Sequence, residues 1–404
     1  MTIYNVLAGP RNTSSGELLY APSQRRTLMF IGDSITWGFG VTQNQAFPAL
    51  VQAQADTRAG STNTAMWTAR NVQCDDIVVG RDTGPPWNVP FKLTNDTGSG
   101  SSLAFDNIGP FASTFSSTIS ATGPSMIFDG VNDGFTVSPS TACRYITVMV
   151  KVFGSGTATL SAFKTGGVQI FDVSGNNGNA TVGSQNVVPT APNVYRFIYD
   201  ATTTSTAFLL RRTDSNTSVS MRILTVNPTD LYPTSNYVQA QINARGSYTM
   251  SDYTSNIASI METVIHPQNE ATSGYTNAFP AFVLSVGTVS MYFDPSLSAS
   301  FDRRIAPSEY RGNLNALVNA IRAASPSSPI FLTHPPIATS PWVLTPGLTR
   351  SQYDAEIQSV AISQNLPVID LRSALTAGDY SDGIHPTAAG QAKLAAVYNA
   401  ALRL

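Results

Sequence analysis

The stretch Thr27-Leu28-Met29-Phe30-Ile31-Gly32-Asp33-Ser34-Ile35-Thr36 joins an apolar run to a polar turn. A continuous apolar run that ends at a glycine is typical of a strand covered on both faces of a sheet. Ser34 then lies at the carboxyl end of that strand, the edge where open α/β sheets bind ligands. The amides of such a turn point toward the space where an oxyanion would develop. Gly-Asp-Ser alone is equally compatible with a simple capped turn.

Four more apolar runs follow in the C-terminal part of the chain, and helical patterns separate them. The runs cover residues 237–242, 281–285, 329–333 and 366–371. The expected helices cover residues 45–55, 308–324 with Ser308 as N-cap, and Pro386 through Ala401. Crossovers long enough to hold helices join parallel strands. We therefore predict an α/β fold in which a five-stranded parallel sheet carries helices on both faces. The strand order usual for such sheets is two-one-three-four-five.

One crossover is far too long for a single βαβ unit. About 200 residues separate Ser34 from the second apolar run, where such a unit needs only about 30 to 40. Within this gap, short β-rich runs alternate with turn signals, at residues 145–150, 194–199, 207–210 and 219–226. We expect an inserted antiparallel β-sandwich, jelly-roll-like. The expected segments are an N-terminal arm at 1–26, the first part of the α/β domain at 27–74, the insert at 75–232 and the second part at 233–404.

Composition excludes some classes of partner. The net charge is −2 and no block of like charges occurs, so the sequence does not predict a basic surface that would bind nucleic acid. No apolar run reaches the length of a membrane span. The first residues do not resemble a signal peptide, and we expect a soluble chain. Abundant Ser, Thr, Asn and Gly beside four lysines are common in extracellular and virion-surface proteins. Cys74 and Cys143 are compatible with two buried thiols or with one disulfide.

A second polar motif follows the last expected strand. Ser381-Asp382-Gly383-Ile384-His385-Pro386-Thr387 stands at the start of the final helix. A serine hydroxyl needs a base to take its proton, and that base needs an acceptor on its far nitrogen. His385 and Asp382 can fill these roles, although a loop histidine beside a capping aspartate is the simpler interpretation. Because both motifs follow strands of one parallel sheet, their shared edge predicts a catalytic triad of Ser34, His385 and Asp382.

These two motifs resemble those of a known family. Gly32-Asp33-Ser34-Ile35-Thr36 looks like the first sequence block of the SGNH (GDSL-like) hydrolases, and Asp382-Gly383-Ile384-His385-Pro386 resembles their last. The resemblance covers about residues 27–56 and 237–404. It implies a three-layer α/β/α SGNH-type fold, a Ser-His-Asp triad and no metal or other cofactor. Residues 243–249 are similar to the second block, which implies an oxyanion hole formed by the amides of Ser34 and Gly246.

The third block departs from the family. Its pattern is Gly-x-Asn-Asp, whereas this chain has Gly287-Thr288-Val289-Ser290. Valine cannot donate a hydrogen bond, and loss of one oxyanion donor typically costs ~10²- to 10³-fold in turnover. Either the two amides suffice, another side chain such as Asn243 or Ser290 substitutes, or the enzyme is weakened.

The remaining histidines do not form a zinc pattern, because they lack paired Cys or Glu spacing. His334 ends the fourth expected strand, where either substrate contact or simple loop geometry explains it. His266 fits a solvated surface position.

The expected insert narrows the range of substrate classes. A β-sandwich between the first two blocks resembles the arrangement in viral haemagglutinin-esterases and some phage tail esterases. The resemblance implies a serine esterase that removes acyl groups, O-acetyl above all, from a polysaccharide or a small molecule. Two alternatives stay open: a broad short-chain carboxylesterase or lipase, and a non-catalytic glycan-binding surface protein with a decayed hydrolase half.

Overall fold

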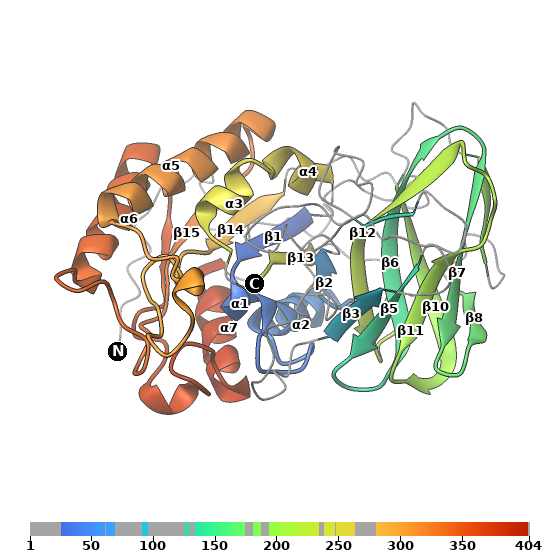
Figure 1. Cartoon of the computed structure of the whole chain (residues 1–404), viewed down its shortest axis with the longest axis horizontal. Helices are drawn as coiled ribbons and strands as arrows, with labels where there is room; N and C mark the ends of the chain where they lie inside the picture. Colours follow the sequence, from blue (N-terminus) through green and yellow to red (C-terminus); the bar gives the residue numbers. More distant parts are fainter. Residues whose placement is uncertain are drawn as a thin grey trace. The chain divides into compact units, whose positions relative to one another are not determined.

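The computed structural model divides into two units by its internal contacts (Figure 1). The first comprises Met1–Ser61, Asn236–Ala258 and Ala278–Leu404, and the second comprises Thr62–Ser235 and Ser259–Asn277. The sequence-based boundaries at residues 26, 74 and 232 differ from these limits and remain predictions. The structure describes residues 26–60, 62–68, 91–95, 126–128, 134–173, 181–186, 194–233, 238–246, 248–262 and 280–402.

The described part of the first unit contains a parallel sheet of five strands. In chain order these are β1 (Arg26–Gly32), β13 (Val238–Ala244), β14 (Ala281–Ser285), β15 (Ile330–His334) and β16 (Val368–Asp370). In space they run β13-β1-β14-β15-β16, and each neighbouring pair is parallel. Every residue of β14 and β15 is buried, as expected for strands covered on both faces. The predicted fold class and strand order are confirmed.

Helices cover both faces of this sheet (Figure 1). One layer contains α2 (Phe47–Ala59) and α7 (Ala388–Leu402), which contact each other. Phe30 of β1 faces this layer, with its ring centroid 5.5 Å from that of Phe47 and 5.7 Å from that of Tyr398. The opposite layer contains α3 (Met250–Thr254), α5 (Pro307–Ala324) and α6 (Arg350–Gln364). Helix α4 (Ile257–Glu262) spans the boundary at Ala258 between the first unit and a segment of the second. Three short helical turns complete the unit: α1 (Ser34–Trp37), η5 (Ala299–Phe301) and η6 (Ala377–Asp379).

All three predicted helices start at a different residue, and α2 begins at Phe47 rather than at residue 45. The apolar stripe expected on α5 is buried at Leu314, Leu317, Val318 and Ile321, but Ser308 is not the N-cap. The cap is Ala306, and Pro307 occupies the first helical position, because proline has the required φ and lacks the amide that would stay unpaired there. The last helix begins at Ala388 rather than at Pro386, which forms an antiparallel bridge with Tyr380.

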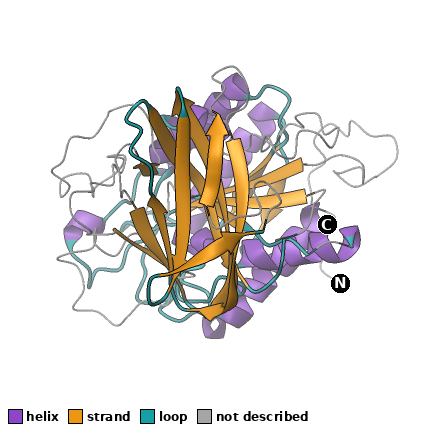
Figure 2. Ribbon diagram, turned by 90° about the vertical axis from the view of Figure 1, so that its right-hand side faces the viewer, coloured by secondary structure: helices purple, strands orange, loops and turns teal. Residues whose placement is uncertain are grey.

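The second unit is built from antiparallel strands (Figure 2). One group runs β2-β12-β6-β10 with β4 also paired to β12, and the other runs β7-β11-β5-β3 with β9 also paired to β7. Strand β8 pairs with both β10 and β7. The strands are β2 (Met66–Thr68), β3 (Phe91–Asn95), β4 (Met126–Phe128), β5 (Gly134–Pro139), β6 (Cys143–Gly154), β7 (Thr157–Lys164), β8 (Val168–Asp172), β9 (Thr181–Asn186), β10 (Val194–Ser205), β11 (Phe208–Arg212) and β12 (Val219–Thr229).

Polar side chains join the two groups of strands from within. The hydroxyl of Tyr199 in β10 donates to the carbonyl of Leu160 in β7 at 3.1 Å. The guanidinium of Arg212 in β11 is 1% exposed on its side chain, and it donates to the carbonyls of Val219 at 2.7 Å and Phe128 at 3.2 Å. Because buried polar groups must be paired, these bonds fix how the two groups lie on one another. Antiparallel strands packed in this way confirm the expected class of the insert.

Some sequence-based expectations fall outside the described residues. These are most of the N-terminal arm, the position of His266, and Cys74, so the structure does not address whether Cys74 pairs with the buried Cys143. None of the helices that the structure describes is long and apolar enough to cross a membrane.

Candidate active site

The serine turn begins where β1 ends. Asp33 is the N-cap of α1, and its carboxylate accepts a hydrogen bond from the amide of Ile35 at 3.2 Å. Ser34 is the first residue of this short helix and is 6% exposed. Gly32 allows the sharp turn, because a Cβ atom there would collide with the side chain of Thr36. The sequence therefore folds into a strand, a capped turn and a serine at the sheet edge.

Contacts from neighbouring segments hold this turn in place. The carbonyl of Gly32 accepts bonds from the Tyr253 hydroxyl at 2.6 Å and from the Arg245 amide at 3.2 Å. The Thr36 hydroxyl donates to the carbonyl of Ser285, at the end of β14, at 3.1 Å. A serine whose backbone is fixed in this way loses little freedom when it reacts.

The histidine loop reaches the serine from the other end of the chain. Nε2 of His385 lies 2.8 Å from Oγ of Ser34, and Nδ1 lies 2.6 Å from Oδ2 of Asp382. The other oxygen of Asp382 accepts from the amides of His385 at 2.8 Å and Ile384 at 3.1 Å. An ionised carboxylate only accepts, so Nδ1 carries the proton and Nε2 is free to accept from the serine. The structure thus brings together the three residues predicted from the sequence.

The electrostatics of Asp382 suit an ionised partner for His385. Burial acts to raise the pKa of this carboxyl, but the hydrogen bond and charge of His385, with the two backbone amides, outweigh it and leave the pKa below its usual value. Asp382 therefore stays charged at neutral pH and can accept the proton on Nδ1 of His385 in a hydrogen bond.

A loop after β15 packs tightly against the histidine loop. The amide of Thr339 donates to the carbonyl of Gly383 at 2.7 Å, and the indole nitrogen of Trp342 donates to the carbonyl of Asp382 at 3.0 Å. Gly383 has a φ of +91°, and a Cβ atom there would lie 2.5 Å from the carbonyl oxygen of Ser340. Only glycine fits this left-handed, crowded position.

A buried carboxylate links the serine turn to the third block. Asp33 is fully buried, and its second oxygen accepts from the amide of Thr288 at 3.2 Å. Burial raises the pKa of Asp33 to about 6, against the lowering effect of the amides of Ile35 and Thr288 and of His385. The third block therefore keeps a structural connection to the serine although it has valine at position 289.

The expected oxyanion residues lie around the same edge. Gly246 follows β13 and is partly exposed. Asn243, in β13, is fully buried, and neither polar atom of its amide has a hydrogen-bond partner among the described residues. The hydroxyl of Ser290 is likewise buried without a partner in that part of the chain. Val289 is partly exposed. The roles of Gly246, Asn243 and Ser290 in the oxyanion hole stay predictions.

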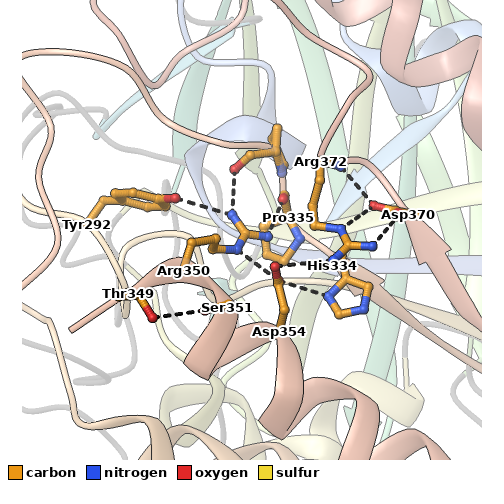
Figure 3. A network of polar contacts seen from close by, with 10 residues as sticks. Tyr292, His334, Pro335, Thr349, Arg350, Ser351, Asp354, Asp370 and Arg372 are labelled. Atoms are coloured by element: carbon orange, nitrogen blue, oxygen red, sulfur yellow. Dashed lines mark hydrogen bonds and ion pairs between the residues drawn. The ribbon is translucent and has the colours of Figure 1, made fainter.

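His334 lies in a separate polar network (Figure 3). Its Nδ1 is 3.1 Å from Oδ1 of Asp354 in α6, which also accepts from Arg350 at 2.9 Å. Arg372 contacts the other oxygen of Asp354 at 3.3 Å. Burial acts to raise the pKa of Asp354, but His334 and Arg350 lower it to about 2. The network joins the end of β15 to α6, and a substrate contact by His334 stays a prediction.

Sequence reasoning missed several residues that shape the site. Gln391 of α7 is fully buried, donates to the carbonyl of Ile35 at 3.1 Å and accepts from the amide of Phe47 at 2.9 Å. A signal existed, because Gln391 shares a helical stripe with the buried Leu394 and Tyr398, and a lone polar residue on such a stripe needs partners. The role of Trp342 could not be predicted from a local sequence pattern, because its contact with Asp382 forms only in the folded chain.

In the ranges that the structure describes, no cluster of three or more His, Cys, Asp or Glu side chains could hold a metal ion.

Comparison with known proteins agrees with this geometry. Residues 224–393 match the model of the GDSL-like lipase/acylhydrolase family. This matched part of the chain belongs to the SGNH hydrolase superfamily. It is a carboxylic ester hydrolase. The matched residues of this SGNH hydrolase include Asp382 and His385, and Ser34 precedes them. No curated protein matches its sequence.

Solved structures resemble this SGNH hydrolase at low identity. A peptidoglycan O-acetylesterase is 14% identical with a TM-score of 0.50, over 94% of this chain and 92% of that one, and shares the fold. An active-site mutant of a family-two carbohydrate esterase from Clostridium thermocellum is 12% identical with a TM-score of 0.29, over 69% and 93%. A family-two carbohydrate esterase from Cellvibrio japonicus is 13% identical with a TM-score of 0.28, over 78% and 99%.

Proposed function

We propose that this chain is a serine esterase that removes O-acetyl groups from a carbohydrate, with Ser34 as nucleophile, His385 as base and Asp382 as its orienting partner. The observation that carries the proposal is the unbroken hydrogen-bonded chain from Ser34 Oγ through the His385 imidazole to Asp382, at 2.8 Å and 2.6 Å. Nucleophile and base lie within the reach that proton transfer requires.

The reaction follows from these positions. Ser34 attacks the ester carbonyl while His385 accepts its proton, and Asp382 stabilises the imidazolium that forms. His385 then donates this proton to the departing alcohol oxygen, which leaves an acyl-enzyme on Ser34. A water molecule gives a proton to His385, attacks the acyl group and releases the acid. The serine regains its proton from the imidazolium.

The oxyanion must be stabilised without the family asparagine. We infer that the amides of Ser34 and Gly246 supply the donors, because the side chain of Val289 has no donor group. Asn243 and Ser290 are second candidates, since each carries a buried polar group with no partner among the described residues.

A carbohydrate substrate is supported by the architecture and by one structural relative. The second unit is a large β-rich body that ester hydrolysis alone does not require. A structure with the same fold is that of a peptidoglycan O-acetylesterase, so O-acetylated peptidoglycan is the first glycan to test. The acylated sugar is thus the expected substrate, and a short-chain acyl ester of a small alcohol is the alternative.

The deciding experiment measures acetate release from O-acetylated glycans and from aryl acetates. We expect activity on both, and loss of both in Ser34→Ala with an unchanged melting temperature. Cleavage of aryl acetates alone, with a broad tolerance of acyl-chain length, would support the short-chain carboxylesterase. Failure of Ser34 to react with a fluorophosphonate probe would instead support the non-catalytic glycan-binding alternative.

A further inference from the structure

Two aromatic rings flank the imidazole of His385. The ring centroid of Phe39 lies 4.4 Å from that of His385 at an interplanar angle of 42°, and the Trp342 centroid lies 6.2 Å away at 89°. Phe39 follows the serine turn, and its amide donates to the carbonyl of Ser34 at 3.0 Å. Both aromatic side chains remain partly exposed, whereas His385 is 8% exposed. The imidazole is thus bordered by apolar surface that solvent or substrate can touch.

The chemistry of ester cleavage decides which part of the substrate meets this surface. His385 must donate a proton to the alcohol oxygen as it leaves, so that oxygen has to come within hydrogen-bond reach of Nε2. The oxyanion lies instead against its amide donors. Groups beside the imidazole therefore border the alcohol portion of the ester, and the acyl chain extends away from them.

The indole of Trp342 is held rigidly where it can act as a wall. Its Nε1 donates to the carbonyl of Asp382, while the Tyr380 hydroxyl donates to the carbonyl of Ile337 at 2.7 Å. At the base of the same segment, Arg350 donates to the carbonyls of Pro335 at 2.6 Å and Pro336 at 3.3 Å (Figure 3). A surface fixed before binding loses little entropy when a ligand packs on it.

We propose that Phe39 and Trp342 form an alcohol subsite that favours esters whose alcohol is a ring with an apolar C–H face, such as a pyranose. Aromatic side chains supply large, rigid contact area for such a face, which a small linear alcohol cannot fill. This inference rests on the proposed function of Ser34 and His385. Phe39 and Trp342 both belong to the first unit, so the preference for a sugar would arise there and would not require the β-rich second unit.

The test compares two acetate esters that differ only in the alcohol. The kcat/KM of an O-acetylated methyl pyranoside is divided by that of ethyl acetate, for the full chain and for single variants. Damage to the triad lowers both values equally and cancels in this ratio. We expect Trp342→Ala and Phe39→Leu each to lower the ratio by about tenfold, mainly through the KM of the pyranoside. Trp342→Phe keeps an aromatic face and should retain most of the ratio.

Two controls separate the subsite from a general role. Val343→Ala changes a neighbouring side chain that is 44% exposed, and it should leave the ratio unchanged. The preference for acetyl over butyryl esters of one alcohol should also stay constant in Trp342→Ala and Phe39→Leu. An unchanged ratio with equal losses on both esters would overturn the subsite and reduce Trp342 to a positioning residue. An altered acyl-chain preference would overturn it too, because the pair would then line the acyl side. Activity retained in Ser34→Ala would refute the proposed function itself.

Discussion

Nε2 of His385 lies 2.8 Å from Oγ of Ser34 across a separation of 351 residues. The parallel sheet accounts for this meeting, since Ser34 follows β1 and His385 follows β16, and the carboxyl ends of parallel strands open onto one edge. The geometry leads to expectations that biochemical measurements can check.

Asp382→Asn should lower kcat by about 10⁴-fold while the fold is retained. The amide that replaces the carboxylate can donate to Nδ1, which favours the tautomer that carries its proton on Nε2 and cannot accept from Ser34. Burst kinetics with an aryl acetate measure the acylation step. As a control, Asp370→Asn alters another carboxylate at this sheet edge that pairs with Arg372. Equal activity of Asp382→Asn and wild type would contradict the role of Asp382.

Val289→Asn should raise kcat by about tenfold or more with a smaller change in KM. The variant introduces the side-chain donor that the family pattern has at this position, and one such donor typically accounts for ~10²- to 10³-fold in turnover. Val289→Ala is the matched control and should show no gain. If Val289→Asn has no effect, a donor already occupies that role, and Asn243→Ala and Ser290→Ala then identify it.

Asp33 should make the stability of the fold depend on pH. Its pKa is raised from 3.8 to about 6 by burial, so its contribution is fully present below the unfolded value and is lost as the pH rises through about 6. A shift of this size corresponds to about 3 kcal/mol. We expect the free energy of unfolding of the wild type, relative to Asp33→Asn, to fall by about this amount between pH ~3 and pH ~7.5 in urea titrations. A parallel pH dependence in both proteins would rule this out.

Asp354→Asn should destabilise the fold near neutral pH. The pKa of Asp354 is lowered from 3.8 to about 2, because His334 and Arg350 outweigh its burial. Its contribution, about 2 kcal/mol, is present above the unfolded value and is lost as the pH falls through about 2. Denaturant titration of both proteins measures the difference. Arg372→Ala, whose side chain is 38% exposed, should have a smaller effect, and the reverse order would contradict this assignment.

Much of the first unit could be predicted because its signals are local. The apolar run before Gly32 and the i, i+3, i+4, i+7 stripe around Leu317 each identify an element without knowledge of the rest. The strand order is the one usual for such parallel sheets. The meeting of Ser34, Asp382 and His385 could be predicted because a catalytic triad constrains residue type and each of the two motifs follows a strand of the sheet.

Other parts of the site could not be predicted, because they depend on contacts between distant segments. The start of α5 was predicted one residue too late, because Ser308 as an N-cap and Pro307 as a first helical residue are both common helix-start signals. In the structure the proline occupies the first helical position. The bond between Trp342 and Asp382 joins residues whose proximity no local pattern encodes. The pKa of Asp33 likewise arises from burial beneath the third block, which only the folded chain creates.

Gln391 of α7 holds both the serine turn and the start of α2. The ribosome completes the serine turn early and this helix about 350 residues later. During most of translation, therefore, neither His385 nor Gln391 is present to contact the serine turn. Esterase activity should arise only after α7 has left the ribosome and packed against the serine turn. An incomplete nascent chain would therefore not hydrolyse esters.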